Sequence, residues 1–270
     1  MTNDQEHASA KPRLYHAPSS YYSMIARLAL AEGGIGYEPV FVEIHYRGSQ
    51  QRPDYVRLNP NMTVPTLVLP DRALAESRDI AEFALGVADA GLDDETRRWL
   101  DLHYAFPIDQ LTFGGLLSRN PLARMVIPKR LAAAERRLLR LAAANPDLAD
   151  LYKARAALFA ERVRMFEPAK VQRLAVQRRG EAIGLLDQME ANFADGRAVM
   201  VPPSYGVADT VWTVFLGRME FAGLGAELQK RPGVARYWRA MEARPSFAAA
   251  DIWTKMHLGR LIRGIIRNRA

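Results

Sequence analysis

The first ninety residues alternate short apolar runs with amphipathic segments. β-Branched and aromatic residues in a period-two pattern predict strands, and apolar positions three or four apart predict helices. On this basis we expect strands at 13–16, 39–44 and 66–69, a short extended piece at 73–74, and helices at 20–32 and 77–88. This order predicts a small mixed four-stranded sheet with helices packed on it.

After residue 93 the pattern is helical throughout. Residues 121–165 are rich in the strong helix formers Ala, Leu and Arg and predict a long helical insertion. Pro146 and Pro168 divide this region, and further helices follow. The sequence therefore predicts a tail at 1–12, an α/β domain at 13–89, an all-α domain at 93–254 and a basic amphipathic C-terminal helix at 255–270.

Composition narrows the chemistry. The chain has 37 Lys and Arg against 30 Asp and Glu, a formal charge of +7, and it has no cysteine. Disulfides, zinc–thiolate sites and a protein thiol nucleophile are thereby excluded. The five histidines show no metal-ligand spacing, so we assign no metal. The polar, acidic start and the lack of a long apolar run lead us to expect a cytoplasmic protein.

Three short stretches of the α/β half carry candidate chemistry. The turn at 18–23 puts hydroxyls at a helix N-terminus, which favours an anion, although Ser20 alone reads as an ordinary N-cap. The Val64-Pro65 peptide bond before a strand can be cis, as about 5–6% of X–Pro bonds are. A cis bond there would expose a backbone edge with which an extended peptide can pair. Glu76 and Ser77 open a helix, where a carboxylate and N–H groups can hold an ammonium and a carboxylate.

Together these stretches resemble the glutathione transferase superfamily. The matching text is Ser20 to Glu32, Asn59-Pro60 through Val64-Pro65-Thr66-Leu67, Glu76-Ser77-Arg78-Asp79-Ile80, Val207-Ala208-Asp209, Arg231-Pro232 and Ala243 to Phe247. Within the superfamily the chain looks most like the tetrachlorohydroquinone dehalogenase and ganglioside-induced differentiation-associated branches. The resemblance implies a thioredoxin-like N-terminal domain and an all-α C-terminal domain.

The resemblance also implies a glutathione site. Val64, before a cis Pro65, would pair its backbone with the cysteinyl unit of glutathione. Glu76 and Ser77 would hold the γ-glutamyl ammonium and carboxylate, and Thr63 would lie beside them. The hydroxyl of Ser20 would point at the glutathione sulfur, where a hydrogen bond lowers the pKa of the thiol.

The chain departs from the family pattern at two of these positions. Tyr22 stands where the dehalogenase branch has a cysteine, so the thiol that resolves a mixed disulfide is missing. Its phenol is our second candidate for the catalytic hydroxyl, after Ser20. Thr63 stands where many members have Gln or Lys, so this position does not account for recognition of the glycyl carboxylate. For the substrate pocket we expect aromatic walls from Tyr21, Phe106, Phe113 and Trp212.

We therefore predict an enzyme in which glutathione attacks a hydrophobic or aromatic electrophile by conjugation, halide displacement or aryl ether cleavage. Superfamily dimers dock the N-terminal domain of one subunit on the helical domain of the other. A charge of −6 over residues 1–96 and +10 over 97–180 suits such a homodimer. We take the basic block as solvated helix faces, with no nucleic-acid partner. The alternative is a non-catalytic binding module with this fold. Its basic C-terminal helix can either lie on a membrane surface or pack back on its own domain or across the dimer.

Overall fold

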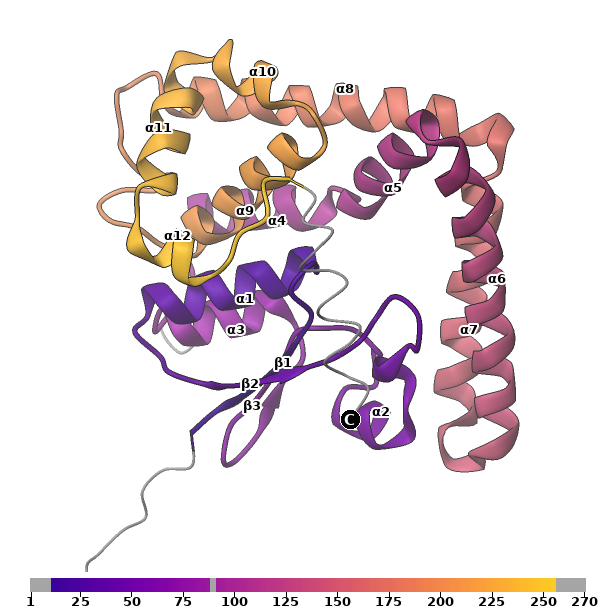
Figure 1. Cartoon of the computed structure of the whole chain (residues 1–270). Coiled ribbons are helices and arrows are strands. Elements are labelled where there is room, and N and C mark those ends of the chain that lie inside the picture. The colour runs from indigo at the N-terminus through magenta and orange to yellow at the C-terminus, as the bar shows by residue number, and fades with distance from the viewer. Residues whose placement is uncertain (1–10, 88–90, 256–270) are drawn as a thin grey trace, which may run out of the picture.

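The computed structural model describes residues 11–87 and 91–255 (Figure 1). Most of the predicted tail and all but the first residue of the predicted C-terminal helix lie outside the described residues. Within those ranges no helix is both long and apolar enough to cross a membrane.

The N-terminal part is a four-stranded mixed sheet in the order β2-β1-β3-β4. β1 pairs in parallel with β2 and antiparallel with β3, which pairs antiparallel with β4. The elements are β1 (Arg13–His16), α1 (Tyr21–Glu32), β2 (Glu38–Phe41), η1 (Ser49–Gln51), α2 (Pro53–Leu58), β3 (Thr66–Val68), β4 (Ala73–Leu74) and α3 (Ser77–Ala84). The predicted mixed sheet is confirmed; α2 and η1 lie in a segment for which the sequence predicted only a connection.

α1 and α3 lie between the sheet and the helical part of the molecule (Figure 1). α1 is apolar nearly all round because it is buried on both sides; Met24, Ile25 and Leu28 have at most 1% of their surface exposed. It ends at Gly33, where a Cβ would collide with the carbonyl oxygen of Ala84 on α3. The missing side chain thus permits the close packing of α1 and α3 at this point.

From residue 94 to residue 249 the regular elements are all helices, as the sequence predicted. The helices are α4 (Asp94–Ala105), α5 (Ile108–Arg119), α6 (Pro121–Ala144), α7 (Ala149–Met165), α8 (Pro168–Asn192), α9 (Val207–Phe221), α10 (Gly225–Gln229), α11 (Pro232–Glu242) and α12 (Pro245–Ala249), with a short η2 (Pro146–Leu148) between α6 and α7. α9 forms the centre, with Trp212 and Phe215 buried, and it packs on both α1 and α4.

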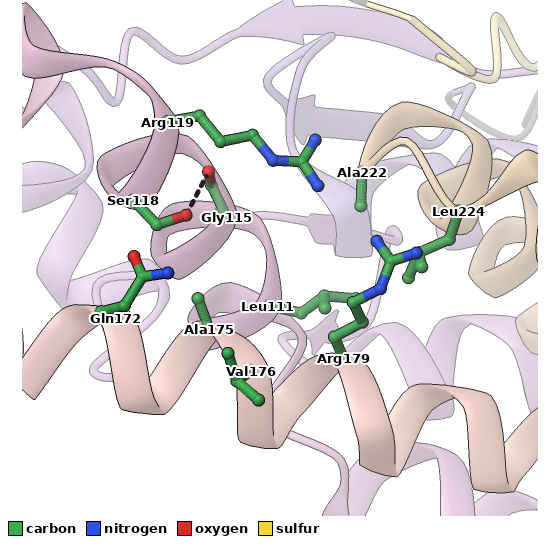
Figure 2. A pocket seen from close by; sticks show the side chains of 10 residues that line it. All are labelled: Leu111, Gly115, Ser118, Arg119, Gln172, Ala175, Val176, Arg179, Ala222 and Leu224. Carbon is green, nitrogen blue, oxygen red and sulfur yellow. Dashed lines mark hydrogen bonds between the residues drawn. The ribbon is translucent and has the colours of Figure 1, made fainter.

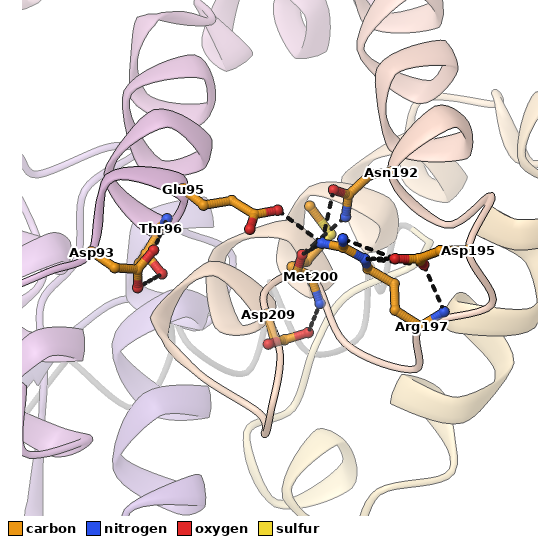
Figure 3. A network of polar contacts seen from close by, with 8 residues as sticks. All are labelled: Asp93, Glu95, Thr96, Asn192, Asp195, Arg197, Met200 and Asp209. Carbon is orange, nitrogen blue, oxygen red and sulfur yellow. Dashed lines mark hydrogen bonds and ion pairs between the residues drawn. The ribbon is translucent and has the colours of Figure 1, made fainter.

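Asp209 fixes the start of α9. Its carboxylate accepts hydrogen bonds from the backbone N–H of Gly206 (3.0 Å) and of Met200 (2.8 Å). This carboxylate therefore closes the first turn of α9 in the manner of a capping box. Figure 3 shows the neighbouring network, in which Arg197 pairs with Glu95 at the start of α4 and with Asp195 after α8.

The helical insertion is a hairpin of α6 and α7 that runs alongside the N-terminal part (Figure 1). It is bound to α2 and the loop after it. Val56 and Met62 share a buried cluster with Leu138 of α6 and with Tyr152 and Ala156 of α7. The Tyr152 hydroxyl also donates to the carbonyl oxygen of Gln51 (2.9 Å). The hairpin is therefore attached to the sheet domain as well as to the helices it connects.

Candidate active site

The strand registers bring the three predicted stretches to one edge of the sheet. Tyr15, near the end of β1, lies opposite Thr66, the first residue of β3. Leu74, the last residue of β4, lies opposite Leu67. The turn after β1, the loop before β3 and the start of α3 after β4 therefore meet at the same edge.

Ser20 is the N-cap of α1. Its Oγ accepts a hydrogen bond from the N–H of Ser23 (3.3 Å), and the residue is half-buried. Because Oγ is the acceptor in this bond, the hydroxyl hydrogen stays available to donate to a ligand. The first-turn N–H groups of α1 add their partial positive charge there. The position suits an anion, such as a thiolate.

A buried network holds the loop before β3. Tyr55 donates to the carbonyl oxygen of Thr63 (2.6 Å), and the amide of Asn59 bonds the same oxygen (3.1 Å). Both side chains also reach the hydroxyl of Thr66 (2.9 Å each). The Val64-Pro65 peptide bond between these anchors is cis, as the resemblance implies.

This loop leaves the backbone of Val64 free. In the described part of the chain, neither its N–H nor its C=O takes part in a hydrogen bond. Its side chain is buried with Ala17, Val42 and Tyr55, so the residue is fixed although its backbone is unpaired. An extended peptide can pair with such an edge in the manner of an added strand.

The N-terminus of α3 is also open. Glu76 occupies the N-cap position but makes no capping bond. Its Oε1 instead accepts from the Asn61 amide (2.7 Å), and the residue is exposed. The hydroxyl of Ser77, itself 3% exposed, lies 3.1 Å from that of Tyr104 on α4. The uncapped N–H groups can therefore bind a carboxylate while Glu76 faces a cation.

Four ring side chains link this edge to α4. Tyr22 packs edge-on against Tyr21 and parallel to Tyr104, with ring centroids 5.2 and 6.4 Å away. Burial, with added repulsion from the carboxylates of Asp109 and Glu76, raises the pKa of Tyr22 to about 12. The Tyr21 hydroxyl bonds Nε2 of His103 (2.6 Å), and burial lowers the pKa of His103 to about 3. Tyr22 is thus a neutral phenol that borders the edge.

The residues predicted for the substrate pocket differ in exposure. Phe106 is 7% exposed and packs on Phe215, and Trp212 is fully buried with its indole N–H on the carbonyl oxygen of Trp99 (3.1 Å). Tyr21 is 8% exposed and lies in the same core. Phe113 is 38% exposed and contacts Phe166. Three of the four therefore belong to the buried core, and Phe113 lies on the surface of α5.

A pocket of about 190 Å³ lies elsewhere, between α5, α8 and the end of α9 (Figure 2). Leu111 and Leu224 give it an apolar base, and Arg119 and Arg179 reach over it. None of the predicted site residues lines it. We therefore keep it separate from the edge where the three stretches meet.

Some polar contacts at this edge were not predicted. Ser19, next to Ser20, bonds Nε2 of His45 across 2.8 Å. Arg162 of α7 pairs with Asp109 of α5 (3.0 Å), one of the carboxylates that act on Tyr22. These pairs join residues 26 and 53 positions apart, and no local sequence signal marks them. In the described ranges no three or more His, Cys, Asp or Glu side chains are placed to hold a metal ion.

Comparison with known proteins identifies the family. A family model described as "Glutathione S-transferase, N-terminal domain" matches residues 14–88. The chain is 30% identical over 243 residues to "Tetrachloro-P-hydroquinone reductive dehalogenase" of Sphingobium chlorophenolicum, covering 88% of this chain and 95% of that protein. The chain belongs to the glutathione S-transferase family. Both the recognition of that family and the two-part fold predicted from the sequence are confirmed.

Other members of the glutathione S-transferase family are also similar to it. "Glutathione S-transferase TCHQD" of Arabidopsis thaliana is 27% identical over 267 residues, covering 93% of this chain and 91% of the relative. A glutathione transferase family member from Pseudomonas fluorescens, solved with two glutathione bound, has a TM-score of 0.62 at 18% identity, with 92% and 95% of the two chains covered. The poplar glutathione transferase F7 structure has a TM-score of 0.59 at 16% identity, with 94% and 99% covered. At these identities the two structures establish the fold.

Proposed function

We propose that this chain is a glutathione transferase in which Ser20 serves the sulfur of glutathione and the thiolate attacks a hydrophobic, aromatic electrophile. The observation that carries the proposal is the meeting of three ligand-binding features at one sheet edge. They are the Ser20 hydroxyl at the N-terminus of α1, the unpaired Val64 backbone and the uncapped N-terminus of α3. The names of the two relatives, a reductive dehalogenase and a glutathione S-transferase, support the same substrate class.

Each feature fits one part of glutathione. Val64 pairs with the cysteinyl unit, which puts the thiol beside the N-terminus of α1. The γ-glutamyl carboxylate accepts from the Ser77 hydroxyl and the N–H groups of α3, and the ammonium faces Glu76. Ser20 donates to the sulfur and, with the α1 dipole, lowers the pKa of the thiol from about 8.5.

With an aryl halide the chemistry is a displacement. The thiol proton leaves to solvent, the sulfur forms a bond to the ring carbon, and the halide departs with its bonding electron pair. Because the sequence holds no cysteine, the protein has no thiol of its own for a mixed disulfide with glutathione. We therefore propose a single displacement, with the thioether as product, in place of a thiol-dependent reductive cycle.

A thermal-melt titration with glutathione tests binding. A ligand that binds the folded state at 100 times its dissociation constant stabilises it by about 2.7 kcal/mol, which gives a clear rise in melting temperature. No shift at millimolar glutathione would contradict the proposed function.

Turnover is tested with a chromogenic aryl halide. We expect Ser20→Ala to lower kcat by about 100-fold, because it removes a preorganised donor to developing charge, while glutathione affinity changes little. Ser19→Ala is the matched control, since it removes the neighbouring hydroxyl, which bonds His45. Equal losses of kcat in the two variants would show that Ser20 has no special role. A wild type that binds glutathione but does not turn over the aryl halide would favour a non-catalytic binding module.

We also propose a homodimer in which the acidic N-terminal part of one subunit faces the basic helical part of the other. The charges of −6 and +10 in those segments support it. Size-exclusion chromatography at low and high salt is the measurement. A monomer under both conditions would contradict the dimer.

A further inference from the structure

The pocket between α5, α8 and the end of α9 combines an apolar floor with two cations (Figure 2). The side chains of Leu111 and Leu224 are buried at its base. Arg119 of α5 and Arg179 of α8 extend over it from opposite walls. Its described lining residues include no Asp or Glu. A cavity with this lining favours a ligand that has an apolar body and a negative charge.

Arg119 keeps its hydrogen-bonding groups available. In the ranges that the structure describes, this exposed arginine has no ion pair and no hydrogen bond. It reaches across to the turn after α9, where a Cβ at Gly223 would lie 3.2 Å from its Nη1. Gly223 has a φ of +75°, so a glycine there both allows the turn and leaves room for the guanidinium. The N–H groups of Arg119 are therefore placed at the pocket for a ligand to use.

Arg179 is only weakly neutralised. One of its terminal nitrogens lies 3.8 Å from a carboxylate oxygen of Glu227, near the outer limit of an ion pair. The same carboxylate group is 3.0 Å from Nζ of Lys230 and 3.7 Å from a terminal nitrogen of Arg231. Because one negative charge faces three cations, Arg179 still attracts an anion in the pocket.

The walls of the pocket leave room for a flat ring. Gly115 and Ala175 bring almost no side chain to it, and a Cβ at Gly115 would meet nothing within 4 Å. Val176, which is 65% exposed, adds a further apolar surface. Pockets for drug-sized ligands measure about 300–1,000 Å³, so a volume of about 190 Å³ suits a molecule of one or two rings.

We infer that this pocket binds a small aromatic acid, a carboxylate or sulfonate on one or two fused rings. The ring packs on Leu111 and Leu224, and the acid group accepts hydrogen bonds from the two guanidinium groups. Arginine suits both parts of such a ligand, because its N–H groups bind a carboxylate in a bidentate fashion and its planar face stacks on aromatic rings. None of the residues proposed to bind glutathione lines the pocket, so an acid bound there leaves the proposed glutathione site open.

Titration calorimetry with naphthoate and with the neutral naphthamide tests the pocket. We expect the wild type, without glutathione, to bind the acid about 10- to 100-fold more tightly than the amide, because the amide cannot form charge-assisted hydrogen bonds to the guanidinium groups. Arg119→Gln and Arg179→Gln should each weaken the binding of naphthoate about tenfold and leave that of naphthamide nearly unchanged. Arg173→Gln is the matched control at an exposed arginine of α8 outside the pocket, and it should bind both ligands as the wild type does.

Gly115→Leu tests the location without removing a charge. The added side chain enters open space, and leucine is a better helix former than glycine, so the variant should fold. Because it fills the pocket, it should weaken the binding of both ligands at least about tenfold. An unchanged melting temperature of the variant without ligand serves as the control for folding.

A wild type that binds no naphthoate, or that binds the acid and the amide equally, would overturn the inference. Naphthoate binding that survives the three pocket substitutions would do the same. Displacement of naphthoate by glutathione or by the aryl halide would place the acid in the active site and contradict a separate pocket. Since these titrations need neither glutathione nor turnover, a failure of the proposed function would leave their outcome unchanged.

Discussion

Ser20 and Tyr22 are two hydroxyls on one turn with different surroundings. Ser20 caps α1, so its oxygen lies at the positive end of a helix. Tyr22 belongs to the first turn of α1, and its ring packs against Tyr21 and Tyr104. Two carboxylates, Asp109 and Glu76, add to the burial that raises its pKa. The burial and the carboxylate charges that disfavour a phenolate at Tyr22 would also disfavour a glutathione thiolate bonded to its hydroxyl.

We therefore expect Tyr22→Phe to keep kcat for an aryl halide within about threefold of the wild type, well short of the loss expected for Ser20→Ala. The phenylalanine preserves the ring contacts, so folding should not interfere. Steady-state kinetics with saturating glutathione make the comparison. A larger loss in Tyr22→Phe than in Ser20→Ala would assign the catalytic hydroxyl to Tyr22.

His103 makes the fold sensitive to acid. Burial lowers its pKa from 6.5 to about 3, so the folded state holds the neutral imidazole while an unfolded chain gains a proton below pH 6.5. The stability that this group contributes is present above pH 6.5 and is lost as the pH falls toward 3. Between pH 7 and pH 5 the loss is about 2 kcal/mol.

His103→Gln removes this titration. The free energy of unfolding of the variant should therefore fall by about 2 kcal/mol less than that of the wild type between pH 7 and pH 5. Urea denaturation at pH 7 and pH 5 measures the difference for both proteins. The gap in the free energy of unfolding between the wild type and the variant should narrow on acidification. The same loss in both proteins would show that other groups set the acid sensitivity.

At the scale of elements, α4 supports the start of α3. The hydroxyl of Tyr104 bonds that of Ser77, the residue proposed to donate to the γ-glutamyl carboxylate. Burial raises the pKa of Tyr104 above its usual value, so the phenol is neutral and able to donate. It orients the serine without touching the sulfur.

Tyr104→Phe should therefore raise the KM for glutathione about three- to tenfold, with kcat nearly unchanged, because a typical hydrogen bond contributes about 0.5–1.5 kcal/mol. Tyr46→Phe, on an exposed ring, is a control for loss of a phenol. A fall in kcat with an unchanged KM would mean that Tyr104 acts on the reaction and not on binding.

The elements show what the sequence could and could not predict. The sheet and most helices follow from periodicity, and the cis Val64-Pro65 step follows from the resemblance. α2 was missed because its six residues are too few for an apolar period, although Pro53 at its first position and Asp54 in its first turn are start signals.

The side chains around the site were harder to predict. Phe106 and Trp212 are apolar residues on helices, and the sequence alone does not distinguish a core aromatic from one that lines a pocket.

For the whole molecule, Arg27 joins the two parts. It belongs to α1, is 4% exposed, and its Nε donates to the carbonyl oxygen of Ala250 (2.7 Å). One of its terminal nitrogens donates to the carbonyl oxygens of Pro18 (3.2 Å) and Asp251 (3.1 Å). Burial lowers the pKa of this guanidinium to about 10, which leaves it charged at neutral pH. The turn before α1 and the segment after α12 are thus bound to a single side chain.

Arg27→Met should lower the free energy of unfolding by about 3 kcal/mol or more, since several buried carbonyl groups lose their donor. Arg239→Met, at an exposed position of α11, should change it by less than about 0.5 kcal/mol. Tryptophan fluorescence in urea reports on the helical part, because all four tryptophans follow residue 93. Equal effects of the two substitutions would contradict this role of Arg27.

The hairpin of α6 and α7 also acts as a spacer. Arg162 lies ten positions after Tyr152 on α7, a rise of about 15 Å, with the first residue bound at Gln51 of η1 and the second at Asp109 of α5. A helix bound at both ends fixes the separation of the two elements that it contacts, so the spacing of η1 and α5 is set by a number of helical turns. A one-turn insertion into α7 between these contacts would shift one relative to the other by about 5.4 Å without changing a proposed catalytic group.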